Sequence, residues 1–164
     1  MNHRVGLRVS IVAITLFVPG AVMAESGTYE SVGSFAPNYT KLEFPGQLIT
    51  GGALQGAAQI VQSTGGLFAE GSNALFECIV YAKKSDAGMD LESPCVMTDA
   101  SGDKLFYVSK RKVGDMGAGG EGRQDYVGGT GKFAGITGGC SYRTDYVSPN
   151  RAISHQKCHW QNPN

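Results

Sequence analysis

The chain has 164 residues, of which 41% are hydrophobic, and its 14 basic and 14 acidic side chains give a net charge of zero at pH 7. This length suffices for a single domain with a real hydrophobic core. The balanced charge argues against a strong electrostatic attraction to nucleic acids or to anionic membranes, so we expect no nucleic-acid partner.

Residues 1–24 have the pattern of a secretory signal peptide. A basic start precedes an apolar run over Val9–Val18, and small residues end the segment at Ala24. The apolar run is too short for a comfortable transmembrane span. We therefore expect cleavage after Ala24 and export to the periplasm or the cell exterior. The mature domain would cover residues 25–164, with 12 basic against 14 acidic residues once Arg4 and Arg8 are removed from the 14 basic ones.

The four cysteines of an exported chain predict two disulfides, for which three pairings exist. Two strand-like runs flank Ser148–Arg151, and a hairpin centred on Pro149 places Cys140 directly opposite Cys158. Opposed cysteines on neighbouring strands lie within bonding distance. The expected disulfides are therefore Cys140–Cys158 and, by elimination, Cys78–Cys95, the latter joining a strand to the far side of a long loop. The same hairpin aligns Tyr142 with Gln156, Arg143 with His155, and Thr144 with Ser154.

The middle of the chain predicts strands and no helix. Residues 53–63, 74–82, 95–98 and 104–112 have strand-like composition, whereas 83–93 and 114–122 have the polar or glycine-rich composition of loops. Within 104–112, Leu105, Tyr107 and Ser109 share one face, and Phe106 and Val108 share the other. Many short strands with glycine-rich turns predict an all-β fold, either a sandwich or a single antiparallel β-barrel.

The stretch from Gly128 to Tyr142 interleaves glycines with the apolar residues Phe133, Ala134 and Ile136. We expect a tight turn over residues 128–131, a bent segment that buries Phe133 and Ile136, and a strand from Cys140. Such glycines favour a barrel, because closing a small sheet requires sharp bends. A phosphate-binding loop is excluded, since no helix follows and Phe133 stands where the magnesium-binding hydroxyl should be. The glycine motif comprises Gly128, Gly129, Gly131, Phe133, Gly135 and Gly138.

Two segments resemble the allene oxide cyclase and dirigent β-barrel superfamily, and most closely its exported bacterial members. Residues 128–138 match the pattern G-G-T-G-[KR]-[FY]-x-x-x-x-G, and residues 95–105 match C-x-x-x-D-x-x-G-D-x-[LF]. The resemblance covers roughly residues 75–145. It implies a barrel of eight antiparallel strands with a largely apolar interior. The catalytic residues of the plant members lie outside both segments and are not carried over.

Two groups of residues have metal-binding side chains without the geometry of a metal site. His155 and His159 share a strand face but would lie about 13 Å apart, and Cys158 between them is needed for a disulfide. The segment Asp99–Asp103 lacks the glycine of a calcium loop, whose place Lys104 takes, and is expected to form a hairpin turn. We expect neither a metal nor a cofactor.

Catalytic apparatus is sparse in this sequence. Glu77 is a weak candidate, because a carboxyl inside an apolar barrel would have a raised pKa and could act as acid or base. The favoured alternative is that Glu77 faces solvent or pairs with a lysine, since charged residues are rarely buried unpaired. Tyr107, Tyr142 and Arg143 are the candidates for lining a ligand site.

Two functions remain open at this point. The favoured one is a non-catalytic exported module that binds an apolar small molecule inside the barrel or presents its loops to a partner. The alternative is a cofactor-free cyclase or isomerase of the allene oxide cyclase type, which would require polar groups to converge inside the barrel. Association of the barrels into homo-oligomers is compatible with either function.

Overall fold

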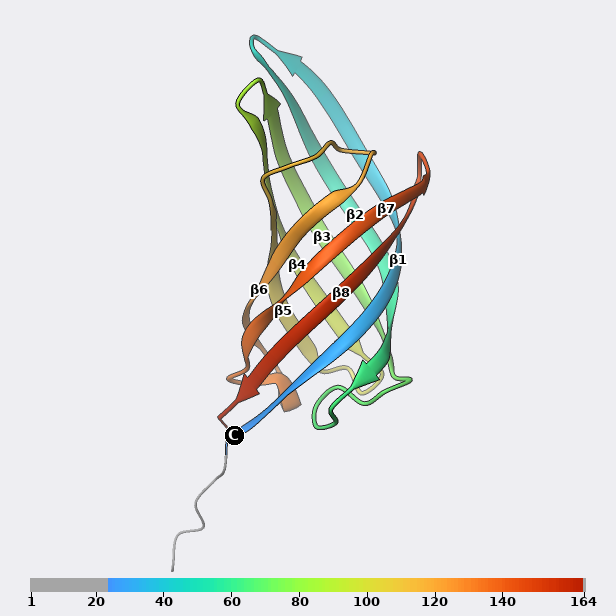
Figure 1. Cartoon of the computed structure of the whole chain (residues 1–164), viewed down its shortest axis with the longest axis vertical. Coiled ribbons are helices and arrows are strands. Elements are labelled where there is room, and N and C mark those ends of the chain that lie inside the picture. The colour runs from blue at the N-terminus through green and yellow to red at the C-terminus, as the bar shows by residue number, and fades with distance from the viewer. Residues whose placement is uncertain (1–23, 164) are drawn as a thin grey trace, which may run out of the picture.

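The computed structural model describes residues 24–163. Residues 1–23, which hold nearly all of the predicted signal peptide, lie outside the described residues, as does Asn164. Eight antiparallel strands close a single barrel, in which each strand pairs with the next along the chain and β8 returns to β1 (Figure 1). The predicted all-β fold, an eight-stranded antiparallel barrel, is confirmed. The strands are β1 (Glu25–Phe44), β2 (Gln47–Ser63), β3 (Asn73–Ser85), β4 (Gly88–Asp99), β5 (Lys104–Arg111), β6 (Gly120–Gly129), β7 (Thr137–Ser148) and β8 (Arg151–Asn162).

The barrel has two different ends. At one end lie the connections 64–72, 100–103 and 130–136, together with the start of β1, the end of β8 and the 3₁₀ turn η1 (Gly131–Phe133); we call it the η1 end. At the hairpin end lie the short turns 45–46, 86–87 and 149–150 and the longer connection 112–119. The β1–β2 hairpin extends beyond the rest of the barrel at this end, at the top of Figure 1.

The segment 83–93 is not a loop, contrary to the sequence-based prediction. β3 continues to Ser85, and β4 starts at Gly88 after a turn of two residues. In β4, Met89 and Leu91 are buried, while Asp90 and Glu92 between them are exposed. The alternating outward acids make the whole segment look hydrophilic, although every second side chain enters the barrel. Similarly, β6 already begins at Gly120, within the predicted glycine-rich loop.

Both predicted disulfides are present, Cys78–Cys95 and Cys140–Cys158. Each joins two directly opposed residues of neighbouring strands, with Cα atoms 4.1 and 4.0 Å apart. The first disulfide links the two strands of the β3–β4 hairpin rather than a strand and a loop. The register of β7 against β8 also contains the three other predicted pairs, Tyr142–Gln156, Arg143–His155 and Thr144–Ser154.

The glycine-rich stretch turns the chain from β6 into β7 around a buried aromatic ring. Gly131 has a φ of 54°, a left-handed conformation that side chains with a Cβ rarely adopt. A Cβ on Gly129 would lie 2.5 Å from the Cβ of Phe133, so only glycine lets this ring approach β6. Phe133 is 1% exposed and Ile136 3%. β7 begins at Thr137, three residues before the predicted start.

An aromatic cluster closes much of the η1 end. Phe68, from the connection between β2 and β3, stacks on Tyr29 with ring centroids 4.1 Å apart. Its ring also lies 5.4 Å from that of Phe133 and 5.9 Å from that of Trp160. A Cβ on Gly66 would lie 2.7 Å from the Trp160 ring, so glycine at this position permits the closure. Burial of such large rings is the main apolar stabilisation of this end.

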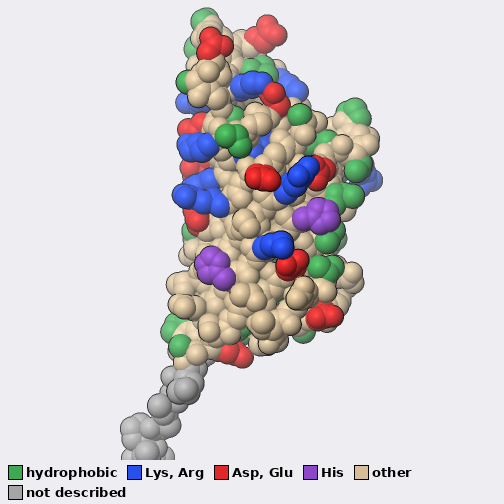
Figure 2. Space-filling view, in the orientation of Figure 1, with side chains coloured by type: hydrophobic (Ala, Val, Ile, Leu, Met, Phe, Trp, Pro, Cys, Tyr) green, Lys and Arg blue, Asp and Glu red, His purple; other side chains and the backbone are tan. Residues whose placement is uncertain are grey.

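The outer surface carries charges of both signs. On the face shown in Figure 2, acidic and basic side chains intermingle over the half of the barrel towards the hairpin end, and the half towards the η1 end is mostly uncharged. Within residues 24–163 we find no helix with the length and apolar character needed to traverse a membrane.

Candidate functional site

The barrel interior contains a cavity of about 490 Å³ at the η1 end, which we call the wide chamber. The strands place every second side chain towards it, and the 64–72 connection, the 99–103 turn and η1 form its rim. Its wall is mostly apolar and aromatic, with a few polar groups, the usual composition of small-molecule sites. The inward side chains include Tyr29, Ser31, Ala58, Ile60, Phe68, Phe76, Met97, Leu105, Tyr107, Gln124, Tyr126, Phe133 and Gln156.

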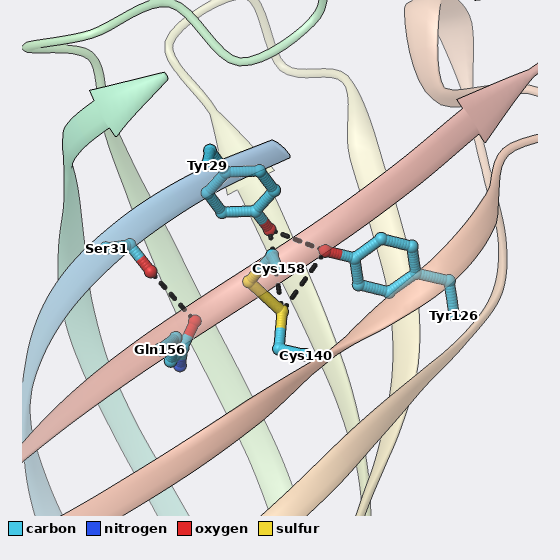
Figure 3. Close-up of a disulfide and its surroundings, with 6 residues drawn as sticks. All are labelled: Tyr29, Ser31, Tyr126, Cys140, Gln156 and Cys158. Carbon is cyan, nitrogen blue, oxygen red and sulfur yellow. Dashed lines mark hydrogen bonds between the residues drawn. A yellow bond between two sulfur atoms is a disulfide. The ribbon is translucent and has the colours of Figure 1, made fainter. Parts of the chain in front are cut away.

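The polar groups of the wide chamber are bonded to one another. The hydroxyls of Tyr29 and Tyr126 lie 2.7 Å apart, and that of Tyr126 lies 3.2 Å from Sγ of Cys140 (Figure 3). A disulfide sulfur can only accept, and the Tyr29 hydroxyl lies farther from it, at 3.9 Å. The shorter contact therefore assigns the bond to the sulfur to the Tyr126 hydroxyl, and that of Tyr29 donates to Tyr126. Between β1 and β8, Ser31 Oγ donates to Oε1 of Gln156 over 2.9 Å. These bonds hold the two tyrosine rings and the Gln156 side chain in place.

The interior tyrosines are proton donors rather than bases. Burial raises the pKa of Tyr29 well above its ordinary value, and the neighbouring Tyr126 adds to the effect. Burial likewise raises the pKa of Tyr107 and of Tyr126. The three hydroxyls therefore stay protonated at physiological pH. That of Tyr107 can donate to a ligand, whereas those of Tyr29 and Tyr126 can do so only by giving up their bonds to Tyr126 and Cys140.

A second, smaller cavity of about 70 Å³ lies towards the hairpin end, and we call it the narrow chamber. It shares four wall residues with the wide chamber, so the two are adjacent parts of one interior: Phe76, Tyr107, Gln124 and Gln156. Its remaining wall is more polar and includes Tyr39, Ser93, Ser109, Arg111, Tyr142, Thr144, Tyr146 and Ser154.

Arg111 is the cation of the narrow chamber, and the sequence-based prediction missed it. Its side chain is 5% exposed. Nη2 donates to the backbone oxygen of Asp115 over 3.0 Å and lies 3.5 Å from Sδ of Met116, whereas Nε is buried without an acceptor. The signal was present in the sequence, because Arg111 continues the inward alternation of Leu105, Tyr107 and Ser109.

The structure separates the predicted site residues into two sets. Tyr107, 7% exposed, and the half-buried Tyr142 line the interior. Arg143 does not line it: its side chain is exposed and bonds Asp145, because successive residues of a strand point to opposite sides of the sheet. Glu77 is also exposed, on the outer face of β3, so the interior carboxyl considered for catalysis is absent there.

The predicted turn over residues 99–103 is present and supports the rim of the wide chamber. Oδ1 of Asp99 accepts hydrogen bonds from the backbone N–H of Ser101 and Asp103, over 2.8 and 3.1 Å. Lys132 of η1 pairs with Oδ2 of Asp99 at 2.6 Å. Burial alone would raise the pKa of Asp99, but the bonds from Lys132 and Ser101 outweigh it and lower the pKa to about 2.

Metal ligands do not assemble in the part of the chain that the structure describes. Residues 24–163 contain no group of three or more histidine, cysteine or acidic side chains placed to hold an ion. His155 and His159 are both exposed on β8, and Cys158 between them is bonded to Cys140.

Comparison with known proteins supports the fold. No protein-family model matches the chain, and no curated protein is significantly similar to it. Among solved structures, the chain is similar to the pterocarpan synthase dirigent protein GePTS1, with a TM-score of 0.56 and 12% sequence identity. The match covers 93% of this chain and 97% of that one. At this identity the likeness concerns the fold alone, which is that of a dirigent-like barrel.

Proposed function

We propose that this chain is a non-catalytic barrel that holds an apolar small molecule in the wide chamber. The observation that supports this function is the chamber itself, with a volume of about 490 Å³ and a wall that is mainly apolar. A cavity of this size falls in the range of small-molecule sites. The polar groups that point inward are protonated tyrosines, a serine and two side-chain amides, which can orient a ligand without reacting with it, and the charged Asp99 and Lys132 at the rim are paired with each other.

A neutral apolar fluorophore, N-phenyl-1-naphthylamine, tests the proposal directly. We expect its fluorescence to rise on binding, and we expect bound terpenoid or fatty-acid-like compounds to raise the melting temperature. The variant Ala58→Phe, which fills the chamber, should abolish both effects. Its neighbour Ala57 is exposed on the outer face, so Ala57→Phe is the matched control and should keep both. Equal binding by the two variants would place the ligand outside the barrel and contradict the proposal.

A cyclase or isomerase is the second candidate, supported by the Tyr29–Tyr126 pair at the chamber wall and by the synthase activity in the name of the similar dirigent protein. A protonated tyrosine could polarise a carbonyl or epoxide oxygen of a bound substrate. Catalysis predicts that a bound compound is converted to an isomer of equal mass and that Tyr126→Phe slows the conversion. A purely binding barrel returns every ligand unchanged, which chromatography of the extracted ligand would establish.

We further propose that the mature protein begins at Glu25 and is exported, as are bacterial members of the superfamily that this chain resembles. The two disulfides support an oxidising compartment. The intact mass of the exported protein tests the cleavage site, since retention of residues 1–24 would refute it.

Self-association stays a prediction. Leu75 and Ile79 on the outer face of β3 and Val127 on β6 are 67%, 63% and 63% exposed, which is compatible with contacts between barrels. Sedimentation at micromolar concentration would determine the oligomeric state.

A further inference from the structure

The guanidinium of Arg111 lacks a counter-ion inside the barrel. None of the ion pairs among residues 24–163 includes Arg111, and the carboxylate of the neighbouring Asp115 is paired with Lys84. Removing a cation from water without a partner costs several kcal/mol, and buried charges are therefore normally paired. Its Nε remains without an acceptor, while Nη2 is held by the backbone oxygen of Asp115. Arg111 thus has the charge and an unused donor with which to bind an anion.

The surroundings of Arg111 provide room and donors for an anion. Gly120, at a φ of 141°, lies against the guanidinium, and a Cβ there would approach Nη1 to 3.3 Å. The narrow chamber of about 70 Å³ is of the size of a single carboxylate group rather than of a whole ligand. Tyr39 and Tyr142 line this chamber. Burial raises the pKa of both hydroxyls, and the charge of Arg111 acts in the opposite direction. Nε and a terminal nitrogen form a planar fork that matches the two oxygens of a carboxylate.

The side chains that border both chambers select what the carboxylate is attached to. Tyr107 and Arg111 both point inward from β5, four residues apart, which is about 13 Å along the strand. Phe76, on β3 and two strands away from β5, borders both chambers, and Phe35 packs edge-on against it with centroids 6.2 Å apart. Aromatic rings stack favourably against such a wall. This distance separates the two backbone positions; a ring joined to its carboxylate by a short arm is shorter, and the side chains of Arg111 and Tyr107 would make up the rest.

We propose that Arg111 binds the carboxylate of an aromatic acid whose ring lies beside Tyr107 and Phe76, an inference that rests on the proposed binding function of the interior. The ligand class is an aryl carboxylate of about the size of cinnamate. The narrow chamber holds the acid group, and the wide chamber receives the ring and any further apolar substituents.

Titration calorimetry of the wild-type protein with cinnamate and with the neutral cinnamamide tests the inference. We expect cinnamate to bind at least tenfold more tightly than the amide. The variant Arg111→Gln should reduce this preference to within twofold. Lys112→Gln is the matched control, because Lys112 is an exposed cation that pairs with Asp90 on the outer face, and it should keep the preference. In the wild-type protein, the Nε–H resonance of Arg111 should shift with cinnamate and not with the amide.

The outcomes separate the two proposals. Equal affinity for acid and amide, or a preference retained in Arg111→Gln, would overturn the role of Arg111 while binding of N-phenyl-1-naphthylamine still supports the function. Failure of all three compounds to bind would overturn the proposed function and this inference together. Should Arg111→Gln not fold, the acid–amide comparison and the Nε–H resonance decide the matter in the wild-type protein.

Discussion

The two chambers of the barrel are formed by the same eight strands but by different chemistry. At the η1 end, Phe68, Phe133 and Trp160 close the barrel, and apolar side chains surround about 490 Å³ of space. At the hairpin end, hydroxyls and Arg111 crowd about 70 Å³. Strand alternation decides only which side chains face inward. The size and polarity of each chamber depend on the connections at its end and on which residue types occupy the inward positions.

The largest expected effect concerns the tyrosines of both chambers at alkaline pH. Burial raises the folded pKa of Tyr29, Tyr39, Tyr107, Tyr126 and Tyr142 above the unfolded value of about 10. Their contribution to stability is therefore complete below about pH 10 and is lost as the pH rises through the folded pKa values. Each tyrosine that stays protonated in the folded state disfavours folding by roughly 1.4 kcal/mol per pH unit above 10.

Unfolding above pH 10 should thus coincide with tyrosine ionisation, and absorbance at 295 nm together with circular dichroism would follow both. The comparison of chambers is sharpened by Tyr107→Phe, at the junction of the two chambers, and Tyr142→Phe, in the narrow chamber. Each should raise the pH of unfolding, and more so for Tyr107, which is the more buried. Ionisation of the interior tyrosines in a folded barrel would show that water reaches them freely and would contradict this account.

The second effect is the loss of packing at the η1 end. Phe133→Ala should destabilise the protein by ~3–5 kcal/mol, the cost of removing a buried aromatic ring. At the hairpin end, Met116→Ala should cost less than half as much, because Met116 is only partly buried. Urea melts of both variants measure the difference, with the exposed Val113→Ala as a control expected within about 0.5 kcal/mol. Equal losses of unfolding free energy would mean that packing of the aromatic cluster stabilises its end no more than packing stabilises the hairpin end.

The third effect compares the two disulfides. They close loops with sequence separations of 17 and 18 residues, so loop entropy predicts a similar ~3 kcal/mol for each. Cys140 also accepts a hydrogen bond from Tyr126, which adds about 1 kcal/mol. The double variant lacking Cys140 and Cys158 should therefore be slightly less stable than the one lacking Cys78 and Cys95. Urea melts would measure the difference. If removal of either disulfide left the free energy of unfolding unchanged, the closed barrel alone would already restrain its strands.

Much of this architecture could be predicted from the sequence, because it depends on local pattern. The strand pairing around Pro149 and the Cys140–Cys158 disulfide follow from symmetric spacing, the Cys78–Cys95 disulfide then follows by elimination, and the face of Tyr107 follows from alternation. The hydrophilic appearance of residues 83–93 concealed a strand, since only its inward half is apolar. Arg111 was missed because a cation at the end of a strand resembles a solvated residue. Its burial depends on the long connection 112–119 folding over it, and no local pattern encodes that contact.

The smallest expected effect concerns Lys132, at the rim of the wide chamber. An exposed lysine on a turn predicts a nearly silent replacement by alanine, within about 0.5 kcal/mol. The structure instead pairs Lys132 with Asp99, whose side chain is only 13% exposed. Lys132→Ala should therefore cost roughly 1–2 kcal/mol at pH 7, a value reduced by the 40% exposure of the lysine side chain.

The pH dependence of this ion pair distinguishes it from simple packing. The folded pKa of Asp99, about 2, lies below its unfolded value of about 3.9. The stability that the pair contributes is therefore present above about pH 4 and is lost as the pH falls towards 2. Urea melts of wild type and Lys132→Ala should differ at pH 7 and converge towards pH 2. Lys104→Ala, an exposed lysine outside the ion pairs of residues 24–163, is the control. A difference that persists unchanged at pH 2 would assign the effect to contact of the lysine stem with the Phe133 ring, from which its Nζ lies 5.0 Å.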